Sequence, residues 1–222
     1  MTNFVFHGDD QLASRQALNQ AIKIERGRGV GEVIRLDASN LGETELRQAL
    51  ESHSLFGQEK LVVVDKLPVK LIDILAHHSG LPPVFIWADK ILTVRELKQL
   101  PNFTPKLFKV PALMFKFLDA LRPDHPQAIL SLYLELNQSQ PTEAIFYFLH
   151  RRISQLIQAK DSPQELKLAD WQKARLSSQA HHFSLDQLLS LHRQLLEIDD
   201  LHKTGATILP LSHTLELFLL NL

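Results

Sequence analysis

The stretch Leu61-Val62-Val63-Val64-Asp65 is a run of four apolar residues that ends in a carboxylate. A second run, Val84-Phe85-Ile86-Trp87, is also apolar without interruption. Continuous runs of this kind are typical of strands that are covered on both faces, as in a parallel sheet. Including these two runs, strands are expected over 4–7, 32–36, 61–65, 83–88 and 107–110.

Helical patterns fall between the first of these strands. Segments 11–26 and 43–53 place leucine or isoleucine residues about one turn apart. Because strand and helix alternate through the first half, we expect an α/β fold with a parallel sheet of about five strands.

From Pro111 onward the sequence is helical throughout, with apolar residues at helical spacing over 111–121, 126–136, 141–160, 185–203 and from about 210 to the end. Several residues mark helix ends. Pro141 and Pro163 stand where a first turn would begin. Capping pairs are expected at Ser162 with Glu165 and at Ser184 with Gln187, and a stop is expected at Gly205. We therefore predict an α/β domain over 1–108 and an all-α domain of five or six helices over 111–222.

The composition narrows the classes of function. The chain has 222 residues, no cysteine, and 24 Lys and Arg against 25 Asp and Glu. The absence of cysteine excludes a disulfide scaffold and a thiolate site, and the balanced charge argues against bulk attraction to nucleic acid. The beginning MTNFVFHGDD has no basic segment, and no apolar run reaches the ~20 residues of a membrane span. We expect a cytoplasmic protein that does not contact a membrane.

An α/β fold of this size raises the question of a nucleotide site. The phosphate-binding pattern GxxxxGK[ST] is absent, and the segment after the first strand reads His7-Gly8-Asp9-Asp10, whose carboxylates would repel phosphate. Asp65 resembles the strand-terminal aspartate that holds Mg²⁺ in P-loop enzymes, although no phosphate loop accompanies it. The glycines of 27–31 follow a helix and precede a strand, the reverse of a dinucleotide site, so they are interpreted as a connection.

Other catalytic patterns are missing as well. The adjacent pairs His77-His78 and His181-His182 point in different directions on a helix, so neither offers a metal-binding face. The patterns HExxH and GxSxG do not occur. We therefore predict no catalytic residue, no metal and no cofactor.

The segment Ser54-Leu55-Phe56-Gly57 is unusually apolar for a connection between a helix and a strand. One interpretation is a helix end packed against the sheet. The other is an exposed apolar plug for a partner protein.

Four stretches together resemble the delta subunit of bacterial DNA polymerase III, the clamp-loader subunit that opens the sliding clamp. They are FVFHGD at 4–9, SLFGQEKLVVVD at 54–65, AIFYFLHRRISQLIQAK at 144–160 and FSLDQLLSLHRQLLEIDDLHKTG at 183–205. Their order and spacing carry the likeness, which spans both ends of the chain.

The resemblance implies a degenerate ATPase-like first domain that does not hydrolyse ATP, followed by a helical collar. It implies that Ser54, Leu55, Phe56 and Gly57 bind the sliding clamp, and that Asp199 and Lys203 form a collar motif. The implied partners are the clamp, the other clamp-loader subunits in a hetero-oligomeric ring and, through that assembly, primer-template DNA. Members of this family usually carry a helical lid between the two domains, and here only a short connection at 106–114 stands in its place.

Two alternatives stay open on the sequence. The chain could be a nucleotide-dependent enzyme of P-loop-like fold with an unrecognised site. It could also be a collar-type adaptor that never binds the clamp. Asp199 and Lys203 are spaced i,i+4, which also suits an ordinary surface ion pair.

Overall fold

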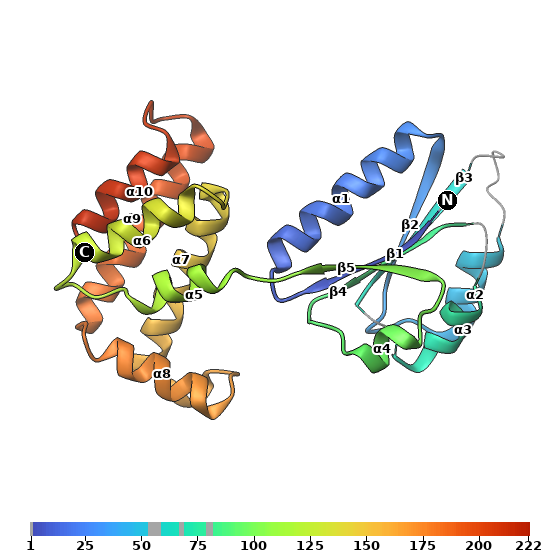
Figure 1. Cartoon of the computed structure of the whole chain (residues 1–222), viewed down its shortest axis with the longest axis horizontal. Coiled ribbons are helices and arrows are strands. Elements are labelled where there is room, and N and C mark those ends of the chain that lie inside the picture. Colours follow the sequence, from blue (N-terminus) through green and yellow to red (C-terminus); the bar gives the residue numbers. More distant parts are fainter. Residues whose placement is uncertain (1, 53–58, 67–68, 79–81) are drawn as a thin grey trace. The chain divides into compact units, whose positions relative to one another are not determined.

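The computed structural model describes residues 2–52, 59–66, 69–78 and 82–222 (Figure 1). The chain divides into two compact units, Met1–Val110 and Pro111–Leu222. The first is an α/β unit and the second is helical, and each is described by itself below.

The α/β unit is built on a five-stranded sheet in which every pair of neighbouring strands is parallel. The strand order is β2-β3-β4-β1-β5, so the first strand lies inside the sheet, between β4 and β5. This confirms the fold class expected from the apolar runs. The strands are β1 (Asn3–Gly8), β2 (Val30–Asp37), β3 (Glu59–Asp65), β4 (Val84–Ala88) and β5 (Phe103–Phe108).

Helices cover both faces of the sheet (Figure 1). They are α1 (Gln11–Gly27), α2 (Glu43–Glu51), the 3-10 turn η1 (Val69–Leu71), α3 (Ile72–His77) and α4 (Val94–Lys98). Leu18 and Ile22 of α1 pack on the face that carries Val63, and Leu46 of α2 and Leu75 of α3 pack on the face that carries Val62. Because successive strand residues point to opposite faces, both faces of β3 must be apolar. This explains why its sequence is a continuous apolar run.

Three details differ from the expectation. The last strand spans Phe103–Phe108 and not 107–110. Among the described residues it is an edge strand paired only with β1, and such a position tolerates Pro105, which lacks the N–H that an interior strand needs. Helix α2 ends at Glu51, where Ser52 turns extended. Helices α3 and α4, of six and five residues, are too short for their apolar spacing to be recognised in the sequence.

The helical unit is described over its whole length and contains six α-helices around α7. They are α5 (Ala112–Asp119), α6 (Pro126–Asn137), α7 (Thr142–Asp161), α8 (Asp170–Ala180), α9 (Leu185–Thr204) and α10 (Leu211–Leu220), with a 3-10 turn η2 (Pro163–Glu165). Helix α7 packs against each of the other five. Its inward residues Ile145, Leu149, Ile153 and Leu156 are fully buried, as the helical spacing predicted.

Two of the helix ends expected from the sequence are observed in the helical unit, and a third is not. Gln187 N–H donates to Ser184 Oγ (3.1 Å) and Ser184 N–H donates to Gln187 Oε1 (2.7 Å), which is the expected capping box of α9. Gly205 ends α9 with a left-handed φ of 68°. The expected helix start at Ser162 is wrong: Pro163–Glu165 makes a single 3-10 turn, and α8 begins only at Asp170. Buried Leu166 leaves that turn in an extended conformation, so the helix does not continue.

Candidate functional site

The carboxyl ends of β1 and its neighbours form the first candidate site. Ligands of open α/β sheets bind beyond the carboxyl ends of the strands, where the connections diverge to opposite faces. Strand β1 holds that position here, because α1 covers one face and the helices after β2, β3 and β4 cover the other. The turn Gly8-Asp9-Asp10 therefore stands where a phosphate would bind.

This turn is occupied by bonds within the chain. Gly8 N–H donates to the Lys90 carbonyl (3.1 Å) and Asp10 N–H donates to the Phe108 carbonyl (3.3 Å). Asp9 Oδ1 accepts from Val110 N–H at 2.9 Å. Backbone N–H groups that cradle a phosphate must be free to point at it, and these donors are already used.

The carboxylate of Asp10 caps α1 and fills the anion position at its N-terminus. Asp10 Oδ1 accepts from Ala13 N–H at 2.9 Å, and the residue is buried. A helix N-terminus favours a negative charge, and here the protein supplies that charge itself. A phosphate at this place would meet a buried carboxylate, which argues against the nucleotide-enzyme alternative.

Gly8 is required by the close approach of the chain after β5. Its φ is 154°, and a Cβ atom on this residue would lie 1.7 Å from the Phe108 carbonyl oxygen. The glycine therefore serves the packing of β1 against β5.

Asp65, the strand-terminal carboxylate, forms an ion pair with Arg15 of α1. The Arg15 guanidinium lies 3.7 Å from the centre of the Trp87 ring, and Trp87 Nε1 donates to Ser14 Oγ at 3.0 Å. Asp65 is thus the polar end of a buried strand, held by an arginine. The sequence did not indicate this pairing, because Arg15 and Asp65 are 50 residues apart.

His7 of β1 accepts a hydrogen bond on Nδ1 from Leu92 N–H at 3.1 Å. Burial lowers the pKa of His7, so the neutral ring that can accept this bond is favoured.

The second candidate site is the connection between α2 and β3. Its four predicted residues, Ser54, Leu55, Phe56 and Gly57, lie outside the residues that the structure describes. Lys60, just after the connection, is buried, and its Nζ donates to the carbonyl oxygens of Ala49 (2.7 Å) and Ser52 and to Ser52 Oγ (3.1 Å).

The last carbonyl groups of a helix have no partner within the helix, and Lys60 supplies one for α2. Its burial lowers the pKa of the ammonium group. Lys60 thereby ties the beginning of β3 to the end of α2, so both flanks of the connection are anchored. Sequence reasoning missed this role of Lys60.

Asp199 and Lys203 lie one turn apart on α9 and form the ion pair that their spacing allows, with Lys203 Nζ 2.6 Å from Asp199 Oδ2. The lysine side chain is 73% exposed and the aspartate side chain 36%. An exposed pair of this kind is worth less than ~1 kcal/mol to folding. Its place in a collar motif stays a prediction.

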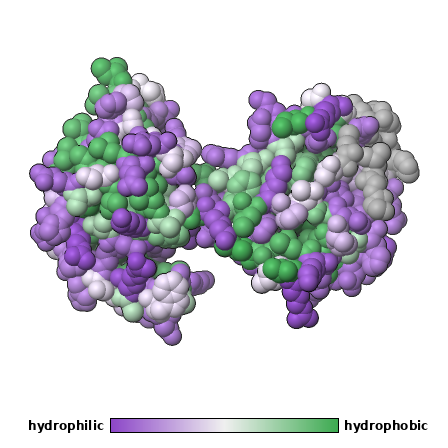
Figure 2. Space-filling model, viewed as in Figure 1, coloured by the Kyte–Doolittle hydropathy of each residue, from purple (hydrophilic) through white to green (hydrophobic). Residues whose placement is uncertain are grey.

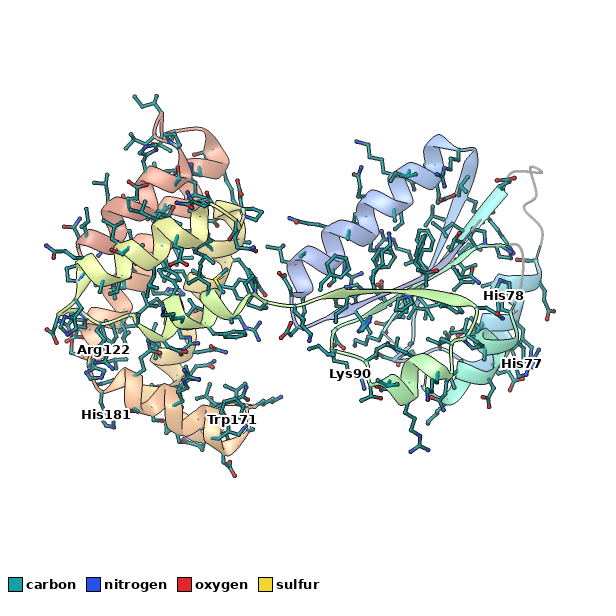
Figure 3. All side chains as sticks on the ribbon, in the orientation of Figure 1. His77, His78, Lys90, Arg122, Trp171 and His181 are labelled. Atoms are coloured by element: carbon teal, nitrogen blue, oxygen red, sulfur yellow. The ribbon has the colours of Figure 1, made fainter. Side chains whose placement is uncertain are left out.

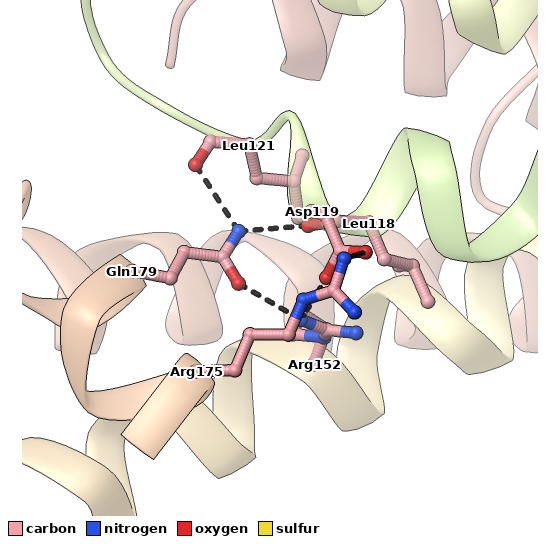
Figure 4. A network of polar contacts seen from close by, with 6 residues as sticks. All are labelled: Leu118, Asp119, Leu121, Arg152, Arg175 and Gln179. Carbon is pink, nitrogen blue, oxygen red and sulfur yellow. Dashed lines mark hydrogen bonds and ion pairs between the residues drawn. The ribbon is translucent and has the colours of Figure 1, made fainter. Parts of the chain in front are cut away.

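The helical unit also holds a buried polar network that the sequence did not indicate (Figure 4). Arg152 of α7 donates through Nη1 to Asp119 Oδ1 (2.9 Å) and to Gln179 Oε1 (2.8 Å). Gln179 of α8 donates to the carbonyl oxygens of Leu118 (2.7 Å) and Leu121 (3.3 Å). The network joins α5, α7 and α8, and Arg175 covers its outer side by pairing with Asp119.

The histidines of the two adjacent pairs either form local hydrogen bonds or are exposed. His77 Nδ1 lies 2.6 Å from the Asp73 carbonyl oxygen, and His78 Nε2 lies 2.7 Å from that of Pro82. His181 is exposed at the end of α8 (Figure 3). Within the described ranges no three side chains of His, Asp or Glu gather as metal ligands. None of the helices described is both long and apolar enough to cross a bilayer.

The chain is distantly similar to solved structures, and no similarity to a family or a curated protein accompanies this likeness. No protein-family model and no curated protein matches the chain. Among solved structures, the DNA clamp loader delta protein of Bacillus subtilis is similar over 99% of this chain and 94% of its own, with 13% identity and a TM-score of 0.43. At these values the relationship is a remote one.

Proposed function

We propose that the chain is a non-catalytic clamp-loader subunit of the delta type, which binds and opens the sliding clamp in the cytoplasm during DNA replication. The observation that carries the proposal is the closed turn at Gly8–Asp10. An α/β unit with a ligand position at the end of β1 has that position filled by its own carboxylates and hydrogen bonds. A subunit that works by protein contacts, without ATP or another cofactor, fits this construction.

In this proposal, the clamp is bound by Leu55 and Phe56, with Ser54 and Gly57 shaping their turn. The anchored flanks support it. Lys60 ties the end of α2 to the beginning of β3, so both flanks of the segment 54–57 are held in place. A rigid base limits the entropy lost when a short apolar segment binds.

The helical unit is proposed to join the other loader subunits, and DNA is reached only through the assembly. Exposed leucines on neighbouring helices support this part: Leu134 on α6, Leu196 on α9, and Leu217 and Leu220 on α10. Figure 2 shows hydrophobic residues gathered on the visible face of this unit. Asp199 and Lys203 would contribute a polar contact to the same collar.

The test is the double substitution Leu55→Ala with Phe56→Ala, made in the full chain. Contact hot spots cost ~2–4 kcal/mol on truncation, so affinity for the sliding clamp should fall at least ~100-fold while the melting temperature stays nearly unchanged. The matched control is Ile91→Ala with Val94→Ala, a pair that is 42% and 70% exposed elsewhere in the α/β unit. This control should bind the clamp as the unchanged chain does.

Other outcomes assign the chain differently. A folded double variant with unchanged clamp affinity would remove the contact from 54–57. A chain that joins the loader subunits but never binds the clamp would be the collar-type adaptor. Saturable binding of ATP-Mg at micromolar concentration would restore the enzyme alternative.

A further inference from the structure

The two edges of the sheet differ in how well they are protected against another strand. Half of the backbone N–H and C=O groups of an edge strand point away from the sheet and can pair with an added strand. Edge strand β5 carries Pro105 near its middle. Proline has no backbone N–H, so it interrupts the series of N–H donors that an added strand would pair with. Edge strand β2 is eight residues long and has no proline. Among the described residues it pairs only with β3.

A basic groove lies beside β2 on the α1 face. It has a volume of about 460 Å³ and runs between Val33 and Arg35 of β2 and the outer side of α1. Three of its six lining residues are cations, Lys23, Arg26 and Arg35, and none is acidic. Within the described ranges these three side chains form no ion pair, and Arg35 Nη2 reaches only Asn19 Oδ1 at 3.5 Å.

A second groove, more apolar, lies beside β2 on the α2 face. Its volume is about 500 Å³. Four of its ten lining residues are apolar, Ile34, Leu36, Leu41 and Ala49, and Glu45 is among the polar ones. The acidic Asp37 stands at its end, where the carboxylate accepts the Ser39 N–H at 2.8 Å. The two sides of this strand edge thus differ. The α1 side has three cations and no acidic residue, and the α2 side has four apolar residues beside the carboxylates of Asp37 and Glu45.

We propose that the outer edge of β2 is a docking site for an extended segment of a partner protein in which acidic and apolar residues alternate. Successive side chains of a strand point to opposite faces. A strand added to β2 would place every second side chain in the basic groove and the others in the apolar groove. Carboxylates complement Lys23, Arg26 and Arg35, while aliphatic side chains complement Ile34 and Leu36. Main-chain pairing supplies affinity in this mode and the alternate pockets supply specificity.

The residues that line the two grooves include none of 54–57 and none of the helical unit. This docking site does not depend on whether the chain binds a sliding clamp. The clamp test and the test below therefore succeed or fail independently.

The probe is a blocked heptapeptide with alternating glutamate and valine, offered to the full chain. We expect saturable binding that weakens with salt, and slower amide exchange along β2 but not along β5. The matched peptide with lysine in place of glutamate should bind at least about tenfold more weakly, because its charge repels the basic groove. Absence of binding at millimolar glutamate peptide, or protection along β5, overturns the proposal.

Backbone methylation separates strand addition from simple charge attraction. One version of the peptide is N-methylated at every glutamate and another at every valine. The N–H groups of alternate residues face opposite edges of a strand, so a peptide paired with β2 through one edge loses binding in only one version. Equal affinity of the two versions contradicts strand addition.

Charge reversal in the protein completes the test. Lys23→Glu with Arg35→Glu should exchange the preference, so that the lysine peptide binds more tightly than the glutamate peptide. The control Lys98→Glu changes an exposed lysine on α4, away from both grooves, and should leave the preference unchanged. An unchanged preference in the double variant overturns the proposed role of the basic groove.

Discussion

Each unit contains an arginine that pairs with an aspartate of a distant segment, and the two pairs differ in how deeply they are buried. In the α/β unit, Arg15 of α1 pairs with Asp65 at the carboxyl end of β3, and the two side chains are 34% and 25% exposed. In the helical unit, Arg152 is 11% exposed and ties Asp119 to Gln179. The first pair joins α1 to the end of β3, and the second network holds three helices together.

The difference in burial predicts which substitutions destabilise each unit most. Removing one partner of a partly exposed pair lets water replace it, whereas removing one partner of a buried network leaves polar groups that water cannot reach. We expect the helical unit to depend strongly on its network, and the α/β unit to depend more on backbone packing at Gly8. The following predictions test this contrast.

The largest effect is expected for Arg152→Ala. The substitution leaves Gln179 Oε1 without its donor and Asp119 with only its exposed partner Arg175. The free energy of unfolding should therefore fall by about 3 kcal/mol. Urea unfolding followed by circular dichroism measures the loss. The control Arg175→Ala removes a side chain that is 61% exposed and should cost less than ~1 kcal/mol. Equal losses in the two variants would contradict the contrast between buried and exposed partners.

A smaller effect is expected for Gly8→Ala. The added methyl group meets the Phe108 carbonyl oxygen, so β5 must shift, and the strained backbone should cost about 2 kcal/mol. The control Gly27→Ala adds a methyl group at the end of α1, where no atom lies within 4 Å, and should leave stability unchanged or slightly raised. The same unfolding curves compare them, and a harmless Gly8→Ala would mean that the approach of β5 is loose.

The smallest effect is a pH dependence in the helical unit. His150 stacks near Phe146 and His192, and its Nε2 is buried without a partner. Burial, and then His192, lower the pKa of His150. The unfolded chain therefore binds the proton more readily, and stability should fall as pH drops below the unfolded value near 6.5.

His150→Gln should remove part of this loss, whereas His181→Gln, at an exposed position, should not. The comparison is the difference in unfolding free energy between pH 7 and pH 5. His7 should likewise lower the stability of the α/β unit as the pH falls, because burial lowers its pKa too. An unchanged difference in His150→Gln would show that this ring titrates alike in the folded and unfolded chain.

Local patterns in the sequence predicted much of the fold. The apolar runs at 61–64 and 84–87 indicated strands covered on both faces, because no other arrangement buries four successive apolar side chains of a strand. The pair Ser184 and Gln187 and the glycine at 205 marked both ends of α9. Asp199 and Lys203 form the ion pair that their spacing allows.

Interactions between distant segments could not be predicted. Arg15 pairs with Asp65, 50 residues away in the sequence, and Arg152 pairs with Asp119, 33 residues away. The sequence around each arginine contains no pattern that indicates its partner. Lys60 gives no sign in the sequence that it will cap α2. Ser54, Leu55, Phe56 and Gly57 remain a prediction, since they lie beyond the residues described.

The position of β1 between β4 and β5 has a consequence for how the chain folds during synthesis. Phe4 pairs with Phe85 on one side and with Thr104 on the other, so β1 leaves the ribosome long before either of the strands that it pairs with. Pairings between distant segments form slowly, while helices of the second unit need only nearby residues. Until β5 has emerged, the apolar β1 is exposed to aggregation, and this interval is where a chaperone would be needed.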